Sequence, residues 1–212
     1  LAMIESGLNS KAYSYAHASG IWQFISSTGK MYGLKKNWWI DERRDFEKST
    51  RAAAHYLKDL YAEFGDWYLS FAAYNCGSSR VKKEMKRHQS DDYWKLKRLP
   101  PQTRNYVPSI MAAIFIANNP QKYGFAILKE ESMDWRTVDI DKSVSLDILS
   151  ECAKLDINSL QIYNPELKQG TLPPLKEKET YPFRLPLKAS SKFDSILAAV
   201  KVEIMEEVVF VD

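Results

Sequence analysis

Residues 49–77, "STRAAAHYLKDLYAEFGDWYLSFAAYNCG", decide the fold class of this chain. In the first part of this stretch, apolar residues recur at helical spacing: Ala53, Tyr56, Leu57, Leu60, Tyr61 and Phe64. Gly65 ends the pattern, because glycine tolerates the left-handed conformation that closes a helix. A second apolar helix is predicted from about Asp66 to near Gly77. The stretch therefore predicts two consecutive helices with a very short connection.

Helical patterns extend over residues 1 to about 125. Residues 100–120, "PPQTRNYVPSIMAAIFIANNP", open with prolines, continue with apolar residues and close at Asn118-Asn119-Pro120, which predicts another helix. This half contains no period-two alternation of any length. No run of about 18 apolar residues occurs anywhere, so the sequence predicts no membrane-spanning segment.

The pattern changes after Gly124. Residues 135–141 and 180–186 are predicted as short strands. Between them, residues 145–156 predict a helix capped by Ser145, and residues 157–164 predict a second short helix.

These elements predict a mainly α-helical domain followed by a small α+β module. We place the helical domain at 1–125, the module at 126–187 and a C-terminal extension at 188–212. The extension is helix-like over 191–207 and ends in the apolar "VVFV".

The two parts carry opposite charge. Residues 1–125 hold 19 Lys and Arg against 11 Asp and Glu, whereas the remainder holds 11 against 16. The basic part fits an anionic polymer, such as nucleic acid, a membrane surface or a carboxylate-bearing wall glycan, or simply a solvated surface. The absence of any Gly-rich, zinc or helix-turn-helix signature argues against nucleic acid. Most Trp and Tyr residues lie in the basic part, where they suit either sugar stacking or helix packing.

Cysteine and histidine usage predicts neither a metal site nor a cofactor. Cys76 and Cys152 are far apart, lack metal-ligand spacing and are expected to be small buried thiols unless their segments meet. Because Leu1 is not an initiator methionine, we expect the chain to be processed or part of something longer.

Glu5 is the only carboxylate within residues 4–24, "IESGLNSKAYSYAHASGIWQF". The apolar residues before it predict a buried helix whose end leaves Glu5 partly desolvated, which would raise its pKa and suit it to general-acid work on a glycosidic bond. Most glycosidases need a second carboxylate. The next two, Asp41 and Glu42, lie in a charge-dense "DERRD" that predicts an ion-paired scaffold. A lone acid thus indicates a substrate that supplies its own nucleophile, or merely a solvated residue.

Four motifs favour the catalytic interpretation of Glu5 over the solvated one. They are "IESGLNSKAYS" (4–14), "ASGIWQF" (18–24), "AAYNCG" (72–77) and "QTRNYVP" (102–108). In this order they closely resemble the lytic transglycosylases of the soluble-type domain family, in particular the membrane-bound type D branch. The resemblance covers about residues 1–125 and implies a goose-lysozyme-like helical fold.

The resemblance implies a role for individual residues. Glu5 matches the catalytic acid and base, which would cleave the glycosidic bond between N-acetylmuramic acid and N-acetylglucosamine and leave a 1,6-anhydro end. Gln23 matches the glutamine that binds sugar N-acetyl or hydroxyl groups, and Tyr106 matches a tyrosine held close to the acid. The remaining matches are cleft residues: Ser6, Ser14, Tyr74 and Asn75.

Two substitutions depart from the family pattern. Gln102 stands where many relatives have glutamate, and Cys76 replaces alanine. The chain also begins only four residues before Glu5. Two rivals therefore stay open, namely a water-using muramidase and a non-catalytic wall-binding protein.

The second part resembles a degenerate LysM-like module, on the strength of "SLQIYNPELKQGTLPP" (159–174) and "YPFRLP" (181–186). The family implies peptidoglycan glycan strands as the partner, without nucleic acid, and a periplasmic place in a bacterial envelope. Glycan binding by this module, membrane anchoring upstream of residue 1 or to an outer membrane, and protein partners are left open.

Overall fold

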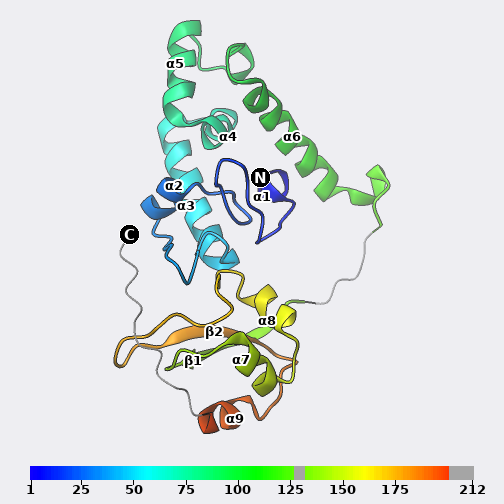
Figure 1. The fold of residues 1–212 in the computed structure, drawn as a ribbon. Coiled ribbons are helices and arrows are strands. Elements are labelled where there is room, and N and C mark those ends of the chain that lie inside the picture. Colours follow the sequence, from blue (N-terminus) through cyan, green and yellow to red (C-terminus); the bar gives the residue numbers. More distant parts are fainter. Residues whose placement is uncertain (127–131, 201–212) are drawn as a thin grey trace. The chain divides into compact units, whose positions relative to one another are not determined.

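A computed structural model gives the structure of residues 1–126 and 132–200, which form two compact units. The first unit contains residues 1–34 and 46–126 (Figure 1), and the second contains residues 35–45 and 132–200. A mainly helical unit and a smaller α+β unit confirm the predicted fold class.

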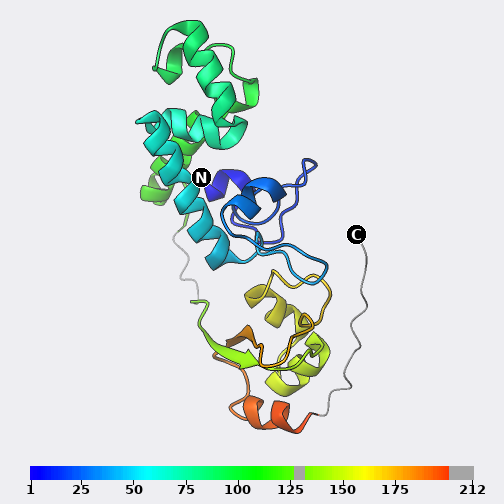
Figure 2. The same ribbon diagram turned by 90° about the vertical axis from the view of Figure 1, so that its left-hand side faces the viewer.

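Helices make up the first unit (Figure 2). In chain order they are α1 (Ala2–Ser6), α2 (Ser26–Met31), α3 (Phe46–Phe64), α4 (Trp67–Cys76), α5 (Ser78–His88), η1 (Tyr93–Lys95), α6 (Pro101–Asn118) and η2 (Pro120–Tyr123).

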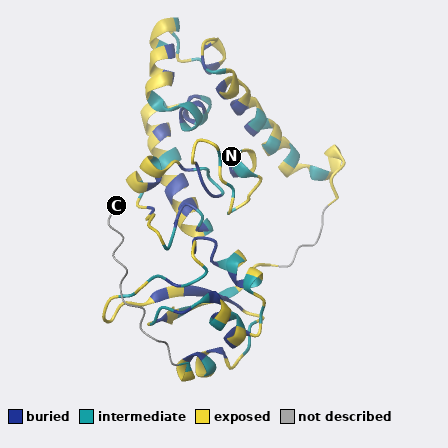
Figure 3. Ribbon diagram, viewed as in Figure 1, coloured by how far each residue is buried: buried dark blue, intermediate teal, exposed yellow. Residues whose placement is uncertain are grey.

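Helix α4 is the core of this unit. Its residues Leu69, Ala72 and Ala73 are fully buried, and it packs against α3, α5 and α6. Figure 3 shows dark blue, buried positions on the helix that Figure 1 labels α4. The Asp66 carboxylate caps its start by accepting a hydrogen bond from the Leu69 amide at 2.8 Å. Gly77, with φ of 87°, ends it. The three helices that sequence patterns predicted in this part are confirmed as α3, α4 and α6.

One prediction about helix α1 was wrong. We expected a buried helix before Glu5, but only Ala2 is buried, while Met3 and Ile4 are 47% and 36% exposed. The helix has five residues and packs on α6, and Ser6 at its end also bonds to the Ile21 carbonyl. Successive residues of a helix point in different directions, so this apolar run is exposed where it turns away from these neighbours.

The second unit is built on a two-stranded antiparallel sheet. Strand β1 (Trp135–Ile140) pairs with β2 (Tyr181–Pro186), with Trp135 opposite Pro186 and Ile140 opposite Tyr181. Its helices are α7 (Leu146–Ala153), α8 (Ile157–Tyr163) and α9 (Phe193–Ala199).

Local signals placed these elements correctly. The Ser145 hydroxyl caps α7 by accepting from the Ile148 amide at 3.3 Å, as predicted. The core contains fully buried Leu149, Leu160 and Phe193, so α9 shares the core of this unit. The predicted helix beyond residue 200 and the "VVFV" segment lie outside the described residues.

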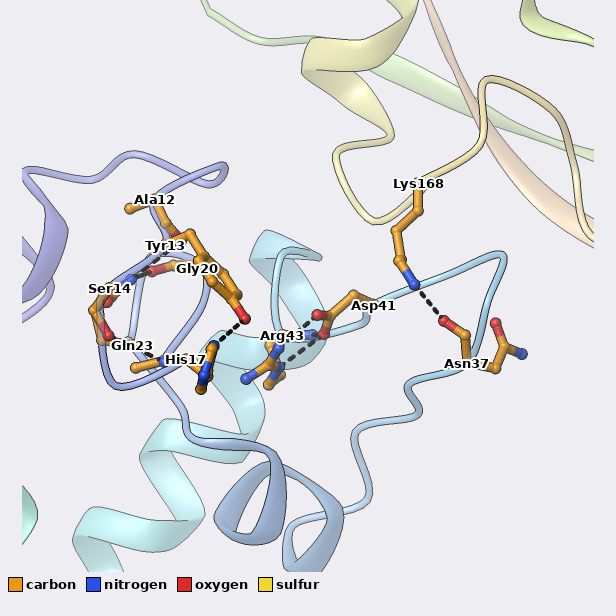
Figure 4. A network of polar contacts seen from close by, with 11 residues as sticks. Ala12, Tyr13, Ser14, His17, Gly20, Gln23, Asn37, Asp41, Arg43 and Lys168 are labelled. Carbon is orange, nitrogen blue, oxygen red and sulfur yellow. Dashed lines mark hydrogen bonds and ion pairs between the residues drawn. The ribbon is translucent and has the colours of Figure 1, made fainter. Parts of the chain in front are cut away.

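Residues 35–45 belong to the second unit although they precede α3 in the chain. The Asp41 amide donates to the Glu166 carbonyl at 2.9 Å, and the Lys168 amide donates to the Trp39 carbonyl at 2.8 Å. The Lys168 ammonium also donates to the Asn37 carbonyl at 2.7 Å (Figure 4). The domain limits at 125 and 187 stay predictions, and none of them anticipated this arrangement.

The "DERRD" segment is an ion-paired scaffold, as predicted. Asp41, Glu42, Arg43 and Asp45 are all buried. The Arg43 guanidinium donates to both Asp41 carboxylate oxygens, at 2.9 and 2.7 Å (Figure 4). Because of Arg43, the pKa of the Asp41 carboxyl is lowered even though burial opposes that shift.

A second buried charge cluster joins this segment to β2. Arg184 lies 2.8 Å from the Asp45 carboxylate and 3.4 Å from Glu166 Oε1. The Tyr181 hydroxyl donates to the same Glu166 oxygen at 2.8 Å. Burial, and then the charge of Asp45, raise the pKa of Glu166, while Arg184 opposes both. Two buried carboxylates thus share one guanidinium.

Candidate active site

The first unit contains an open cavity of about 970 Å³, within the range of small-molecule sites. Residues from α1, α2 and the loop before it, α3, the end of α4 and one face of α6 line it. They are Ile4, Glu5, Ser14, Tyr15, Ala16, Ala18, Gln23, Phe24, Ile25, Thr28, Tyr56, Tyr74, Asn75, Cys76, Gly77, Gln102, Asn105, Tyr106 and Ser109.

Glu5 and Tyr106 form the polar centre of the cavity. Packing of α1 on α6 brings them together, and the Tyr106 hydroxyl donates a hydrogen bond to Glu5 Oε1. Burial raises the pKa of Glu5, and the hydrogen bond from Tyr106 partly opposes that shift. Burial and the charge of Glu5 raise the pKa of Tyr106, so its hydroxyl keeps its proton. Glu5 therefore holds a proton to higher pH than an exposed glutamate would.

Glu5 is the only carboxylate among the described residues that line the cavity, and none of these residues is a lysine or arginine. Gln102 also lines the cavity and contributes an uncharged amide to it. No described side chain could therefore act as a second carboxylate inside this cavity.

Gln23 supports the loop that forms one wall. It adopts a left-handed conformation, with φ of 48°. Its amide nitrogen donates to the Gly20 carbonyl at 2.8 Å and the Ala12 carbonyl at 3.3 Å (Figure 4). With these donors engaged, the amide oxygen is the group that Gln23 can offer to a ligand, as an acceptor.

The loop of residues 12–20 is tightly bonded within itself. The Ser14 amide donates to the Ala18 carbonyl at 2.9 Å, and the Ser14 hydroxyl accepts from the Ala18 amide at 3.1 Å. Tyr13 and His17 are joined at 2.7 Å through the phenol oxygen and Nδ1 (Figure 4). Tyr15 is fully exposed at the cavity and can present its ring to the apolar face of a sugar.

The end of α4 contributes Tyr74 and Asn75 to a second wall. The Tyr74 hydroxyl donates to the Trp22 carbonyl at 2.8 Å, and the centroid of its ring lies 5.0 Å from that of Tyr56, which also lines the cavity. Asn75 Oδ1 accepts from the Thr103 hydroxyl at 2.8 Å. Both residues lie where the sequence motif predicted a cleft.

Ser6 does not line the cavity, unlike the other predicted site residues. Its hydroxyl lies 2.8 Å from the Ile21 carbonyl and 3.4 Å from the Ala2 carbonyl. This position explains the serine as a tie between α1 and the loop that carries Gln23. We therefore correct its expected role from lining the cleft to supporting it.

Sequence reasoning missed several lining residues on α6. Asn105 and Ser109 share a face with Gln102 and Tyr106, because residues three and four apart lie on one side of a helix. Counting along the helix from Tyr106 would have found them. Tyr15 gave no such signal, because it lies in a loop.

Cys76 lines the cavity rather than being fully buried, whereas Cys152 is buried, and both thiols are free. Within residues 1–126 and 132–200, no group of three or more His, Cys, Asp and Glu side chains could hold a metal ion. In the same ranges, no helix combines the length and the apolar character needed to cross a membrane.

Two family models match the chain. Residues 1–97 match the transglycosylase SLT domain, and residues 134–202 match the LysM-like domain of lytic transglycosylase MltD. The cavity thus lies largely within the first match, and the sheet of the second unit within the other.

Similarity to curated proteins agrees with these two family matches. The membrane-bound lytic murein transglycosylases D of Escherichia coli K12 and of E. coli O6:H1 are each 38% identical over 178 residues, or 81% of this chain. The chain spans only 39% of the length of each. A protein of Alteromonas sp. strain M-1, whose name links it to tributyltin chloride resistance, is 31% identical over 67% of this chain and 77% of its own length.

Proposed function

The chain belongs to the SLT-domain transglycosylase family, and we propose that it is a peptidoglycan lytic transglycosylase. The observation that supports this most directly is the solitary acid. Glu5, with its raised pKa and its Tyr106 partner, is the only carboxylate among the described residues lining the cavity.

One acid is sufficient when the substrate provides the nucleophile. Protonated Glu5 gives its proton to the glycosidic oxygen O4, which bridges C1 of N-acetylmuramic acid and C4 of N-acetylglucosamine, and the C1–O4 bond breaks. The resulting carboxylate then takes the proton of the muramoyl C6 hydroxyl as that oxygen bonds to C1. The products are a 1,6-anhydro-muramoyl end and a free O4 hydroxyl. Glu5 is protonated again, and no water is consumed.

The other cavity residues have roles in binding. The Gln23 oxygen accepts from an acetamido N–H or a sugar hydroxyl, and Asn75 and Ser14 offer further polar contacts at the two walls. The rings of Tyr74 and Tyr15 provide surfaces for pyranose C–H faces. Tyr106 holds the Glu5 carboxyl in place.

A water-using muramidase is disfavoured by the same observation. An inverting hydrolase needs a base roughly 6.5–9.5 Å from the acid, and a retaining one needs a nucleophile at about 5–5.5 Å. No described residue of the cavity supplies either. A non-catalytic wall-binding protein would have no need for an acid with a raised pKa at the centre of its groove.

We infer from the proposed substrate that the protein acts in a bacterial cell envelope, in the periplasm. The relatives named as membrane-bound fit that location, although the described helices include none that could span a bilayer. The glycan strands of peptidoglycan are the proposed partner.

Mass spectrometry of digested peptidoglycan tests this function. The unaltered chain should release muropeptides one water lighter than reducing-end products. Glu5→Gln should lower the rate at least about 100-fold, because general acid–base catalysis contributes about that much or more. Glu166→Gln is the matched control, since it makes the same change at a buried, tyrosine-bonded glutamate outside the cavity, and it should keep the activity.

Reducing-end products would show that the chain is a hydrolase. Retained pelleting with the wall, but no products from any variant, would favour the binding protein. Equal loss in Glu5→Gln and Glu166→Gln would remove Glu5 from its proposed role.

A further inference from the structure

Thr103 lies behind the cavity wall, in the first turn of α6. It is 1% exposed and does not line the cavity. Its hydroxyl donates to Asn75 Oδ1 at 2.8 Å and so links α6 to the last turn of α4. Burial keeps water away from this hydroxyl, so the hydrogen bond has no ready substitute.

This bond decides which end of the Asn75 amide faces the cavity. Oδ1 is occupied by Thr103, and no described residue accepts a hydrogen bond from Nδ2. Asn75 itself lines the cavity. An asparagine held in this way has its two N–H donors left for a ligand, while one of the two lone pairs of Oδ1 is already used.

Neighbouring groups hold Thr103 in place through both its side chain and its backbone. Burial raises the pKa of the Cys76 thiol, and a hydrogen bond with Thr103 opposes that shift, so the thiol lies beside the hydroxyl. The hydroxyl of Tyr93, a residue that is 5% exposed, contacts the carbonyls of Thr103 at 3.1 Å and of Arg104 at 3.0 Å. The first turn of α6 is thereby held against η1.

We propose that Thr103 is a positioning residue that orients the Asn75 amide so that Nδ2 donates to an acetamido carbonyl oxygen of the glycan. The inference rests on the proposed function for the identity of the ligand. Without the Thr103 hydroxyl, the amide can turn over and present Oδ1 to that carbonyl. Two acceptors would then face each other, and the contact would be lost.

A double-mutant cycle tests the proposal. The variants are Thr103→Val, which replaces the hydroxyl by a methyl group, Thr103→Ser, which keeps it, Asn75→Ala, and the Thr103→Val, Asn75→Ala pair. Thr103→Val should lower kcat/KM about 5- to 10-fold, the effect expected for losing one oriented hydrogen bond. Thr103→Ser should recover most of that loss. In the Asn75→Ala background, Thr103→Val should cost nothing further.

The same cycle is run as a binding measurement in Glu5→Gln protein, with soluble uncrosslinked glycan chains of alternating N-acetylglucosamine and N-acetylmuramic acid. Binding does not depend on the chemical step, so the two ideas can fail separately. Suppose that the unaltered chain gives anhydro products. If the two substitutions then lower binding additively, or if Asn75→Ala has no effect on binding, the role of Thr103 is overturned and the activity stands. If no products form but the losses of binding are non-additive, the proposed activity is overturned and the role of Thr103 stands.

Unfolding midpoints of each variant separate positioning from folding. If Thr103→Val does not fold, Thr103→Ala in both backgrounds completes the same cycle. Equal losses on changing Thr103, whether or not Asn75 is present, would show that Thr103 acts only through stability.

Discussion

Glu5 in the first unit and Glu166 in the second share a local chemistry but differ in their surroundings. Each is a glutamate whose pKa is raised by burial, and each accepts a hydrogen bond from a tyrosine hydroxyl, Tyr106 or Tyr181. Glu5 lines an open cavity whose described lining residues include no cation, whereas Glu166 is fully buried against Arg184. A raised pKa alone therefore does not identify a catalyst.

The two glutamates differ in whether a ligand can reach them and in whether a cation pairs with them. A ligand can reach Glu5, and no guanidinium holds it in the ionised form, so it can both give and take a proton. Glu166 shares Arg184 with Asp45, and any change in its protonation alters a buried charge cluster. The first arrangement suits chemistry, and the second suits structure.

The largest expected effect comes from removing the shared cation. Arg184→Met leaves Asp45 and Glu166 buried without their guanidinium, which should destabilise the second unit by about 3–5 kcal/mol. Hydrogen exchange of the amides in β1 and β2 measures this loss.

Arg136→Met is the control for that experiment. Arg136 pairs with Asp194 on the surface, with side chains 42% and 58% exposed, so its loss should cost less than about 1 kcal/mol. Similar protection in the two variants would contradict the view that the buried cluster supports the second unit.

An intermediate effect is expected where the two glutamates are most alike. Tyr106→Phe removes a hydrogen bond that favours ionised Glu5, so the pKa of Glu5 should rise further. The alkaline limb of the pH–rate profile, where Glu5 loses its proton, should then move to higher pH. We also expect kcat to fall about tenfold, because the carboxyl loses its support.

Tyr181→Phe makes the same change at Glu166 and should leave the pH–rate profile as it is. Measuring both profiles on the same glycan makes the comparison direct. An unmoved limb in Tyr106→Phe, or a moved one in Tyr181→Phe, would break the distinction between the two sites.

The smallest expected effect concerns stability at Glu5, the proposed catalytic residue. Because folding raises the pKa of Glu5, its stabilising contribution is present below the ordinary glutamate pKa of about 4.3 and is lost as pH rises through the folded-state value. Glu5→Gln has no such titration. It should therefore be more stable than the unaltered chain near neutral pH, by about 0.5–1 kcal/mol, with the difference shrinking in acid. Urea unfolding at several pH values checks this, and a difference that grows in acid would contradict it.

Local signals made much of the fold predictable. The Asp66 cap, the Gly65 and Gly77 stops and the Ser145 cap each act within a few residues, so the ends of their helices could be placed from sequence. The grouping of residues 35–45 with the second unit could not, because it depends on pairs such as Asp45–Arg184, which are 139 residues apart.

Glu5, Gln23 and Tyr106 lie in recognisable motifs and do line the cavity, whereas their roles stay predictions. Ser6 was misplaced because a motif does not say which way a hydroxyl points. Thr103 was overlooked as a site residue because its influence passes through Asn75, and only the hydrogen bond between them shows it.

Residues 35–45 also bear on how this chain can be divided. A cut before residue 132 would separate Asp45 from Arg184, and Asp41 and Trp39 from the backbone of residues 166–168. The shortened protein would keep a polar segment whose charges and amides were matched to residues it no longer has. The second unit is therefore not a contiguous, separable segment of the chain. A transfer of this module to another protein would have to include residues 35–45.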